Sequence, residues 1–346
     1  MTAPAAVADL RRTRVVEAAA LPPPDALLAD GRPTIFRGLA RDWPLAVAGR
    51  DGATAAIAYL KRFDAARPVV AYTGDAAIGG RFFYRDDWSG LNFSAARVGL
   101  TACLDRIAAH LGDGAPPAIY IGSTDLDAYL PGFRAENDLP LPVPPAGHDP
   151  ALASIWIGNR TIAQTHHDMS NNLAVCVVGR RRFTLFPPDQ VSNLYPGPLE
   201  PTPGGQVVSM VDLHAADLDR FPRFADALAA AQVAELEPGD ALYMPSMWWH
   251  HVEGLAPFNV LVNYWWRETP RWLGHPQEAL AHALLAIRDL PDDEKAHWRA
   301  MFDHYVFGDG AEAAAHIPAE ARSVLAPLTP ETAGRLRAHL LRALSR

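Results

Sequence analysis

The strongest constraint on the fold lies in the middle of the chain, where short β-rich runs alternate with turns between residues 118 and 267. Residues 118–122, 173–178 and 258–265 are rich in branched and aromatic side chains, and Pro, Gly, Asn and Asp separate these runs. Many short strands joined by such turns are typical of an antiparallel barrel or a double-sheet jelly roll. We therefore predict a mainly β fold for this region.

Helical spacing of apolar residues flanks the β region on both sides. A first strand is predicted over residues 34–39, one helix behind an Asp51 cap and another behind a Ser94 cap. Near the C-terminus, a helix is predicted behind Thr329, with Pro330 at its first position. The fold is thus expected to carry flanking N-terminal helices and a C-terminal helical appendage.

Three parts are expected along the 346 residues. Residues 1–30 read as an arm rich in Ala and Pro, residues 31–270 as the main domain, and residues 271–346 as a helical region. The Pro-rich stretch at 140–150 is predicted to be a loop of the main domain. The Leu-rich helix faces of the last part either cover the barrel or pair two chains, and this pattern does not choose between the two.

Composition excludes several classes of function. The net charge is −8, with 31 basic and 39 acidic residues, which disfavours binding to a nucleic-acid backbone. No apolar run is long enough for a membrane span or a signal peptide, so we expect a soluble, cytoplasmic protein without membrane partners. Cys103 and Cys176 stand far apart, and thus any metal must bind through His and carboxylate side chains.

Two separated segments carry the polar residues that point to metal chemistry. Side chains alternate along a strand, so His166 and Asp168 face one side and His167 faces the other. A third donor follows 82 positions after Asp168, in the pair formed by His250 and His251, and alternation alone does not decide which of the two takes part. Two His and one carboxylate form the facial triad that leaves positions open on iron(II).

The order of these and other short motifs resembles one known family. The chain is similar to the JmjC/cupin-like Fe(II)- and 2-oxoglutarate-dependent oxygenases and, within them, to the asparaginyl hydroxylase that inhibits the hypoxia-inducible factor. The resemblance covers residues 36–266, and its motifs are FRGLARDWP at 36–44, THHD at 165–168, GRRRFTLFPPDQ at 179–190, LYP at 194–196, FPRF at 221–224, PGD at 238–240, YMPSMWWHH at 243–251 and VNYW at 262–265, together with Asn172. It implies a double-stranded β-helix of the jelly-roll/cupin, JmjC type.

The resemblance also implies roles for individual residues. It makes His166, Asp168 and His250 the metal ligands and the catalytic centre, with Fe(II), 2-oxoglutarate and O2 as cofactor and co-substrates. Residues implied to bind 2-oxoglutarate are Arg181, Tyr120, Asn172 and Asn263, and Trp265 is implied to lie beside the substrate channel. Arginine matches the carboxylate of 2-oxoglutarate in two-point geometry.

Three departures from the family pattern bear on this assignment. Arg181 stands where the family often has lysine, and Ala163 stands where the relative has a threonine whose hydrogen bond could instead come from Gln164 or Thr165. Val207 and Val208 replace an Arg-Gln pair that grips the target amide. The oxygenase chemistry therefore transfers more readily than the asparagine specificity.

The expected function is a 2-oxoglutarate-dependent hydroxylase that acts on a side chain of a protein or peptide and releases succinate and CO2. A small-molecule substrate is the alternative within this class. The alternative outside it is a metal-binding cupin without oxygenase activity that serves as a ligand-binding or interaction module, because one fold hosts many functions. Relatives dimerise through C-terminal helices, so we also expect a homodimer.

Overall fold

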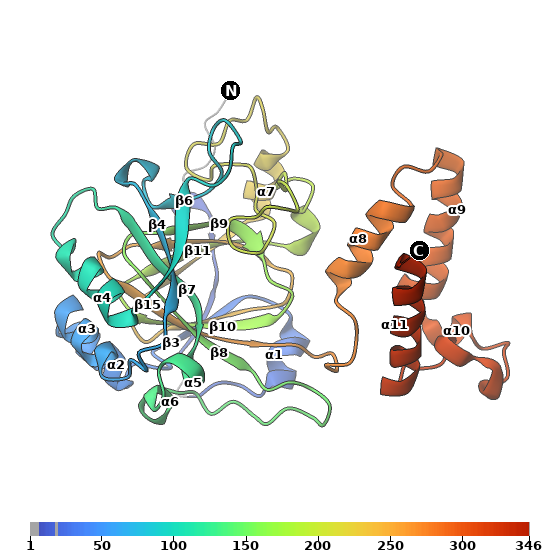
Figure 1. Cartoon of the computed structure of the whole chain (residues 1–346), viewed down its shortest axis with the longest axis horizontal. Helices are drawn as coiled ribbons and strands as arrows, with labels where there is room; N and C mark the ends of the chain where they lie inside the picture. Colours follow the sequence, from blue (N-terminus) through green and yellow to red (C-terminus); the bar gives the residue numbers. More distant parts are fainter. Residues whose placement is uncertain (1–6, 18–19, 346) are drawn as a thin grey trace. The chain divides into compact units, whose positions relative to one another are not determined.

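The computed structural model describes residues 7–17 and 20–345, which divide into two compact units. The first unit spans 1–144 and 150–267, and the second spans 145–149 and 268–346. The first unit is built on two mixed β-sheets (Figure 1). Within the described residues, no helix is both long and apolar enough to cross a membrane.

The first sheet has six strands and the second has nine. In spatial order the six-stranded sheet contains β1 (Arg11–Arg12), β12 (Gln232–Leu236), β11 (Arg181–Phe186), β14 (Trp249–Gly254), β9 (Ile162–His167) and β5 (Arg81–Phe82). The nine-stranded sheet contains β2 (Arg14–Glu17), β3 (Thr34–Arg37), β13 (Ala241–Met244), β10 (Asn171–Val178), β15 (Asn259–Trp266), β8 (Leu152–Gly158), β7 (Ala118–Asp125), β4 (Val69–Gly74) and β6 (Phe93–Val98). Neighbouring strands are antiparallel except in the pairs β1–β12, β2–β3 and β5–β9.

The α-helices flank the sheets of the first unit and make up most of the second. Those of the first unit are α1 (Pro24–Asp30), α2 (Pro44–Arg50), α3 (Ala53–Lys61), α4 (Leu100–Ala109), α5 (Leu126–Tyr129), α6 (Phe133–Glu136) and α7 (Phe224–Ala230). Those of the second unit are α8 (Pro276–Ala286), α9 (Asp292–Phe302), α10 (Gly310–Ala313) and α11 (Pro330–Leu344). The content is thus mixed α/β, where the sequence predicted a mainly β fold.

Three apolar layers hold the first unit together. Buried residues of α2, α3 and α4 pack on the outer face of the nine-stranded sheet, and α7 packs on the outer face of the six-stranded sheet. A third cluster, which includes Ala174, Phe183 and Leu261, fills the space between the sheets. Residues of β10 alternate between the outer and the inner cluster, and all eight are buried, so this strand is apolar on both faces.

The predicted β-runs are confirmed, because residues 118–122, 173–178 and 258–265 all fall on β7, β10 and β15 with shifts of one residue or a few at the ends. The cap at Thr329 is also confirmed, since its side chain accepts a hydrogen bond from the backbone N–H of Thr332. The first strand ends at Arg37, two residues earlier than predicted, because Gly38 adopts a positive φ of 66°.

Two predicted helix caps are wrong. Asp51 ends α2, and α3 begins two residues later with Gly52 as its N-cap. Ser94 lies inside the strand β6, which pairs with β4, and the helix α4 begins only at Leu100. In both cases the residue makes other hydrogen bonds that override its preference for a helix cap. Asp51 continues the backbone bonding of α2, and Ser94 pairs with β4.

A buried turn ties the two ends of the first unit's sequence together. Gly239 has a φ of 98°, and a Cβ there would come within 2.7 Å of the backbone of Arg41. Asp240 is 4% exposed and accepts hydrogen bonds from the backbone N–H groups of Gly38 and Glu237, both at 2.9 Å, and from the side chain of Arg37. Its carboxylate therefore links the end of β3 to the turn between β12 and β13.

We expect Asp240→Ala to lower the free energy of unfolding of the first unit by about 3 kcal/mol, because it leaves two backbone donors and a guanidinium without their acceptor. Urea denaturation followed by near-ultraviolet circular dichroism measures this change. Replacing the exposed Asp42 by Ala is the control and is expected to cost less than about 0.5 kcal/mol. Equal stabilities of the two variants would contradict this role of Asp240.

Candidate metal centre

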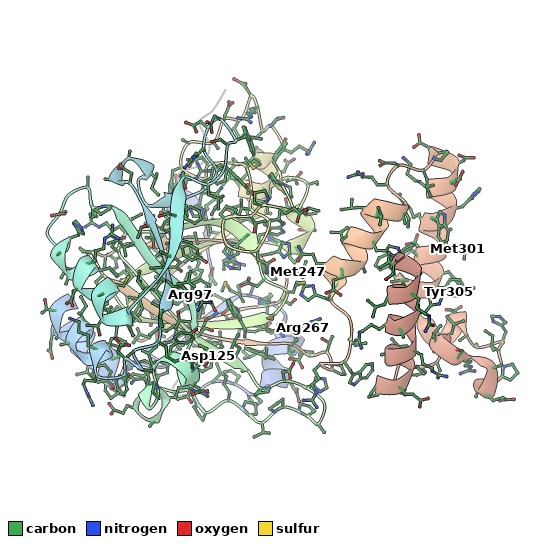
Figure 2. All side chains as sticks on the ribbon, viewed as in Figure 1. Arg97, Asp125, Met247, Arg267, Met301 and Tyr305 are labelled. Atoms are coloured by element: carbon green, nitrogen blue, oxygen red, sulfur yellow. The ribbon has the colours of Figure 1, made fainter. Side chains whose placement is uncertain are left out.

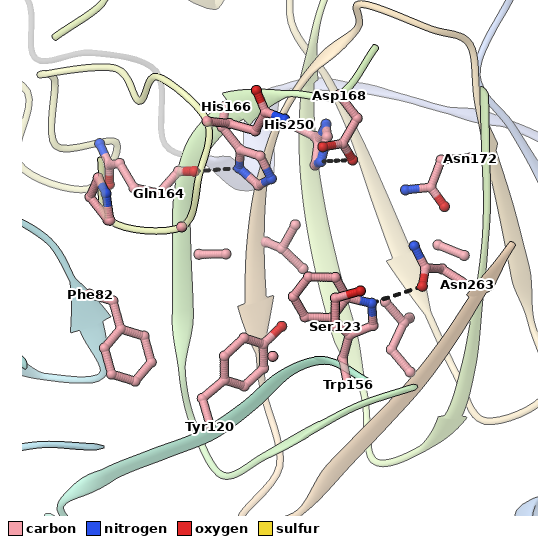
Figure 3. Close-up of a pocket in the computed structure, with 18 of the residues that line it drawn as sticks. Phe82, Tyr120, Ser123, Trp156, Gln164, His166, Asp168, Asn172, His250 and Asn263 are labelled. Atoms are coloured by element: carbon pink, nitrogen blue, oxygen red, sulfur yellow. Dashed lines mark hydrogen bonds and ion pairs between the residues drawn. The ribbon is translucent and has the colours of Figure 1, made fainter. Parts of the chain in front are cut away.

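Two neighbouring strands bring the predicted metal ligands together. In the pairing of β9 with β14, His166 lies directly opposite His250, and their ring centroids are 4.3 Å apart. Asp168 follows the end of β9, and its Oδ2 lies 3.6 Å from Nε2 of His250 (Figure 3). One ligand atom from each of these three residues lies within 4.8 Å of the other two, which is a grouping able to hold a metal ion.

Backbone carbonyls fix the orientation of both imidazole rings. Nδ1 of His166 lies 2.7 Å from the carbonyl oxygen of Gln164, and Nδ1 of His250 lies 3.0 Å from that of Trp248. A carbonyl oxygen only accepts hydrogen bonds, so each Nδ1 carries the proton and each Nε2 keeps a free lone pair. This is the tautomer that metal-bound imidazoles require, with the ring held by a second hydrogen bond.

Burial keeps His250 uncharged at neutral pH. Burial is the largest effect, and together with the neighbouring His166 it lowers the pKa of His250 to about 4, while Asp168 opposes the change. A neutral imidazole is the form that binds metal, so the ligand does not have to lose a proton at pH 7. The electrostatics and the tautomers therefore both suit a cation at this point.

The structure separates the two members of the His250–His251 pair, which the sequence left open. His250 faces His166 and Asp168, whereas His251 points to the opposite face of the six-stranded sheet. His167 also turns away from Asp168 and packs against the ring of Trp249, with centroids 4.6 Å apart. The group that could bind a metal thus contains the first histidine of each pair.

A cavity of about 450 Å³ opens beside the three donors. Its lining includes every site residue named from the sequence: His166, Asp168, His250, Arg181, Tyr120, Asn172, Asn263 and Trp265. A β-bulge inserts one extra residue into β9, so Ala163 and His166, three positions apart, both reach this cavity. Strands of both sheets contribute to the lining, so the cavity lies between them (Figure 3).

Arg181 brings a buried positive charge into the cavity. Its residue is 2% exposed, and its Nε and Nη2 atoms have no hydrogen-bond partner among residues 7–17 and 20–345. Burial raises the pKa of the Tyr120 phenol, and the charge of Arg181 counteracts part of this rise. A buried guanidinium needs acceptors, and the cavity therefore suits an anionic ligand.

Aromatic rings form the wall that the sequence did not identify. Tyr120 stacks between Phe82, at a centroid distance of 6.0 Å, and Trp156, at 5.8 Å. The indole N–H of Trp156 donates to Oδ1 of Asn263 at 2.8 Å, which fixes that amide (Figure 3). Phe82 stands on β5, far from the His-x-Asp motif in sequence but paired with β9, and Trp156 stands on β8, the strand that precedes β9, so only the folded sheets show that both rings line the cavity.

Gln164 and Thr165 do not supply the hydrogen bond that Ala163 lacks. The amide of Gln164 donates to the carbonyls of Ser209 and Val211 at 2.8 and 2.7 Å, and its oxygen accepts from Arg81 at 3.1 Å. Thr165 lies 3.3 Å from Nδ1 of His251, on the other face. Gln164 therefore braces the cavity wall instead of contacting a ligand.

Comparison with known proteins agrees with the cupin-like fold. The model of the cupin-like domain family matches residues 21–271, and the chain belongs to this family. It is 32% identical over 149 residues to HSPB1-associated protein 1 of Rattus norvegicus, covering 42% of this chain and 30% of that protein. It is also 31% identical over 153 residues to Jumonji C domain-containing protein 5 of Drosophila melanogaster, covering 42% of this chain and 36% of that protein.

A third relative is lysine-specific demethylase JMJ31 of Arabidopsis thaliana, 34% identical over 120 residues, with 34% of this chain and 21% of that protein covered. The matches thus span about a third of the length of these relatives, or less. This chain is a JmjC-type, cupin-like protein related to them.

We expect Asp168→Ala to remove one equivalent of bound metal, because two imidazoles without the carboxylate form an incomplete donor set. Mass spectrometry of the metal content, after anaerobic loading with Fe(II) and desalting, measures this loss. His167→Ala is the matched control, since His167 is adjacent in sequence but faces away, and it should keep the full metal content. Equal metal contents in both variants would contradict the assignment of Asp168.

Proposed function

We propose that the protein is an Fe(II)- and 2-oxoglutarate-dependent dioxygenase that hydroxylates a side chain of a protein or peptide. One observation carries this proposal: an open set of three donors shares a cavity with the buried, unsatisfied guanidinium of Arg181. His166, Asp168 and His250 would occupy one face of a six-coordinate ion and leave three positions for 2-oxoglutarate and O2. Open positions favour catalysis over a purely structural metal site.

The position of Arg181 suits the far carboxylate of 2-oxoglutarate. Arg181 of β11 lies opposite Gly254 of β14. Gly254 is four residues from His250, so about 13 Å of strand separates the backbone of His250 from the level of Arg181. Both side chains extend into the cavity, and this interval leaves room for a short dicarboxylate between them. A carboxylate would give Nε and Nη2 of Arg181 the acceptors that they lack in the described structure, and this gain offsets the cost of burying the charge.

Bound iron and 2-oxoglutarate would supply the oxidation: O2 gives one atom to succinate as CO2 leaves, and the other atom to the new hydroxyl group of the product. The residues of this chain orient the reactants. The carbonyls of Gln164 and Trp248 hold the two imidazoles in register, and the stack of Phe82, Tyr120 and Trp156 keeps that side of the cavity dry. Tyr120, Asn172 and Asn263 line the same space and would add polar contacts to the co-substrate.

Protein hydroxylation is the favoured reaction within this class. The lack of a Cys-rich zinc module and the resemblance to an asparaginyl hydroxylase support it, although Val208 lines the cavity where that relative has a polar grip. The asparagine specificity itself stays a prediction. The name of the Arabidopsis relative makes lysine demethylation the competing reaction, which trimethyl-lysine peptides would test.

We expect Arg181→Ala to raise the KM for 2-oxoglutarate about 100-fold, because it removes a charge-assisted pair of hydrogen bonds worth about 3 kcal/mol. Succinate release measures the activity, and anaerobic absorbance on adding 2-oxoglutarate to the Fe(II) protein measures binding. Arg181→Lys should recover part of the affinity. Arg180→Ala is the control, since Arg180 is exposed and pairs with Glu237.

The same experiment separates the two classes of function. Wild-type protein that binds Fe(II) but shows neither an absorbance change nor succinate release would be a metal-binding cupin module and would reject the oxygenase proposal. Activity that survives Asp168→Ala would reject it as well, because the metal would then not be held as proposed.

We also propose that the protein is a cytoplasmic homodimer that pairs through its second unit. That unit, considered by itself, exposes many apolar side chains, among them Met301 and Tyr305 (Figure 2), at 48% and 45%. The largest exposed apolar residues of α8, α9, α11 and the segment after α9 are Leu280, Leu285, Trp298, Met301, Tyr305, Val306, Phe307, Leu340, Leu341 and Leu344. Such a surface favours association with a second copy.

Sedimentation equilibrium should therefore give twice the chain mass of 37.5 kDa at micromolar concentration. The double variant Phe307→Asp/Leu341→Asp is expected to be monomeric, because it places charges on the apolar surface. Val143→Asp is the control, since Val143 is 92% exposed in a loop outside the helices. A monomeric wild-type protein would contradict the dimer.

A further inference from the structure

A second group of metal-binding side chains lies on the face of β14 opposite the cavity. One donor atom each from His214, His251 and Glu253 lies within 4.8 Å of the others. His251 and Glu253 are two residues apart on β14 and therefore share a face, while His250 between Trp249 and His251 points to the cavity. His214 comes from the loop that follows Val211, far from β14 in sequence.

Two donor atoms of this group are buried without a hydrogen bond. His251 is 1% exposed and Glu253 is 7% exposed, and in the described part of the chain neither Nε2 of His251 nor Oε2 of Glu253 has a hydrogen-bond partner. Nδ1 of His251 already faces Thr165 at 3.3 Å, so the free atom of the ring is the one that points toward the group. Buried polar atoms without partners are rare in folded proteins, and a bound ion or water molecule can satisfy them.

An ion pair alone does not satisfy the group. Nε2 of His214 lies 2.9 Å from Oε1 of Glu253, which accounts for one carboxylate oxygen only. The rings of His214 and His251 have centroids 5.9 Å apart and meet edge to face, so they do not hydrogen-bond to each other's lone pairs. A cation bound between the three side chains would give Nε2 of His251 a partner and would bind a carboxylate oxygen of Glu253.

Of the guanidinium groups of Arg182 and Arg81 near this site, that of Arg182 also pairs with Glu253, at the longer of its two carboxylate distances. Arg182 lies 3.7 Å from Oε2 of Glu253, but its Nε donates to Glu235 at 3.1 Å. Arg81 pairs with Asp212 at 3.2 Å. Each neighbouring guanidinium thus has a carboxylate partner other than Glu253.

We propose that His214, His251 and Glu253 form a second divalent-cation site, separate from the cavity. Two imidazole nitrogens and one carboxylate oxygen are the donors that suit Zn²⁺, with water in the remaining position. The side chain of His214 is 43% exposed, which gives the ion a path from solvent. On binding, Nε2 of His214 exchanges its contact with Glu253 for the metal, and the ring proton resides on Nδ1.

This site braces the wall of the cavity. Val208 forms an isolated bridge with His166, and the Gln164 amide holds the carbonyls of Ser209 and Val211. An ion at His214 would attach the end of this same segment to β14. The second site therefore stabilises the segment that lies against a ligand of the first.

Zinc stoichiometry tests the proposal without any measurement of activity. Purified, chelator-treated protein is titrated with Zn²⁺ alone by calorimetry, and the bound metal is counted by mass spectrometry after desalting. Wild-type protein should bind two equivalents, Asp168→Ala one, His214→Ala one, and the double variant none. His297→Ala, which removes an exposed histidine of α9, is the matched control and should bind two.

Glu253→Gln provides a second variant that keeps the shape of the side chain. Combined with Asp168→Ala, it removes the charge of the second site and should abolish the one zinc equivalent that Asp168→Ala protein binds, so zinc should no longer raise the midpoint of thermal unfolding of this double variant. One equivalent in the wild-type protein that Asp168→Ala abolishes would overturn the proposal. So would a second equivalent that persists in both His214→Ala and Glu253→Gln proteins.

Discussion

The pairing of β9 with β14 is the constraint on which the rest of the structure depends. Backbone hydrogen bonds set His166 opposite His250, and the alternation of side chains sends both rings into the cavity. A shift of this pairing by one residue would turn His250 outward and bring Trp249 or His251 inward. Trp249 is 2% exposed and packs with Phe224 of α7 on the outer face, so its burial opposes that shift. Burial of the Trp249 side chain thus stabilises the strand register that places the candidate metal ligands on the other face of β14.

The two ends of the cavity place opposite electrostatic demands on the same sheet. Near the metal ligands, burial favours neutral imidazole, as the lowered pKa of His250 indicates. At the other end, the guanidinium of Arg181 is buried and has only donors, so its burial requires an acceptor from elsewhere. A ligand with a chelating end and an anionic end satisfies both demands at once. For the proposed 2-oxoglutarate oxygenase, the order of residues along β11 and β14 would favour a dicarboxylate over a ligand that matches one end alone.

Local signals predicted those parts of the site that depend on a single strand. His166 and Asp168 share a face because they are two residues apart, and the β-runs around Leu173 and Val262 were readable from their alternation and turns. Ser94 was misread as a cap because its strand exists only through pairing with β4. The choice between His250 and His251 depends on a register set over more than eighty residues, so no local pattern could make it. Side-chain alternation along β14 puts His250 on one face and His251 and Glu253 on the other. His214 becomes a neighbour of His251 and Glu253 only in the folded chain.

The edge of β9 determines which wall of the cavity is least constrained by strand pairing. Its partner β5 has only two residues and pairs with Ile162 and Ala163, so in the described residues β5 does not reach the half of β9 that bears His166, which pairs with β14 on its other side only. The segment around Val208 and Ser209 covers that half through the backbone N–H of Ser209, which donates to Thr165 at 2.7 Å. A loop that covers a strand edge satisfies the backbone of that edge, and the side chains of the loop can still be replaced. The side chains of a paired strand, in contrast, are constrained by the packing of the sheet. Substrate selectivity is therefore expected to reside in this segment, and the ligands on β9 and β14 can stay unchanged as it varies.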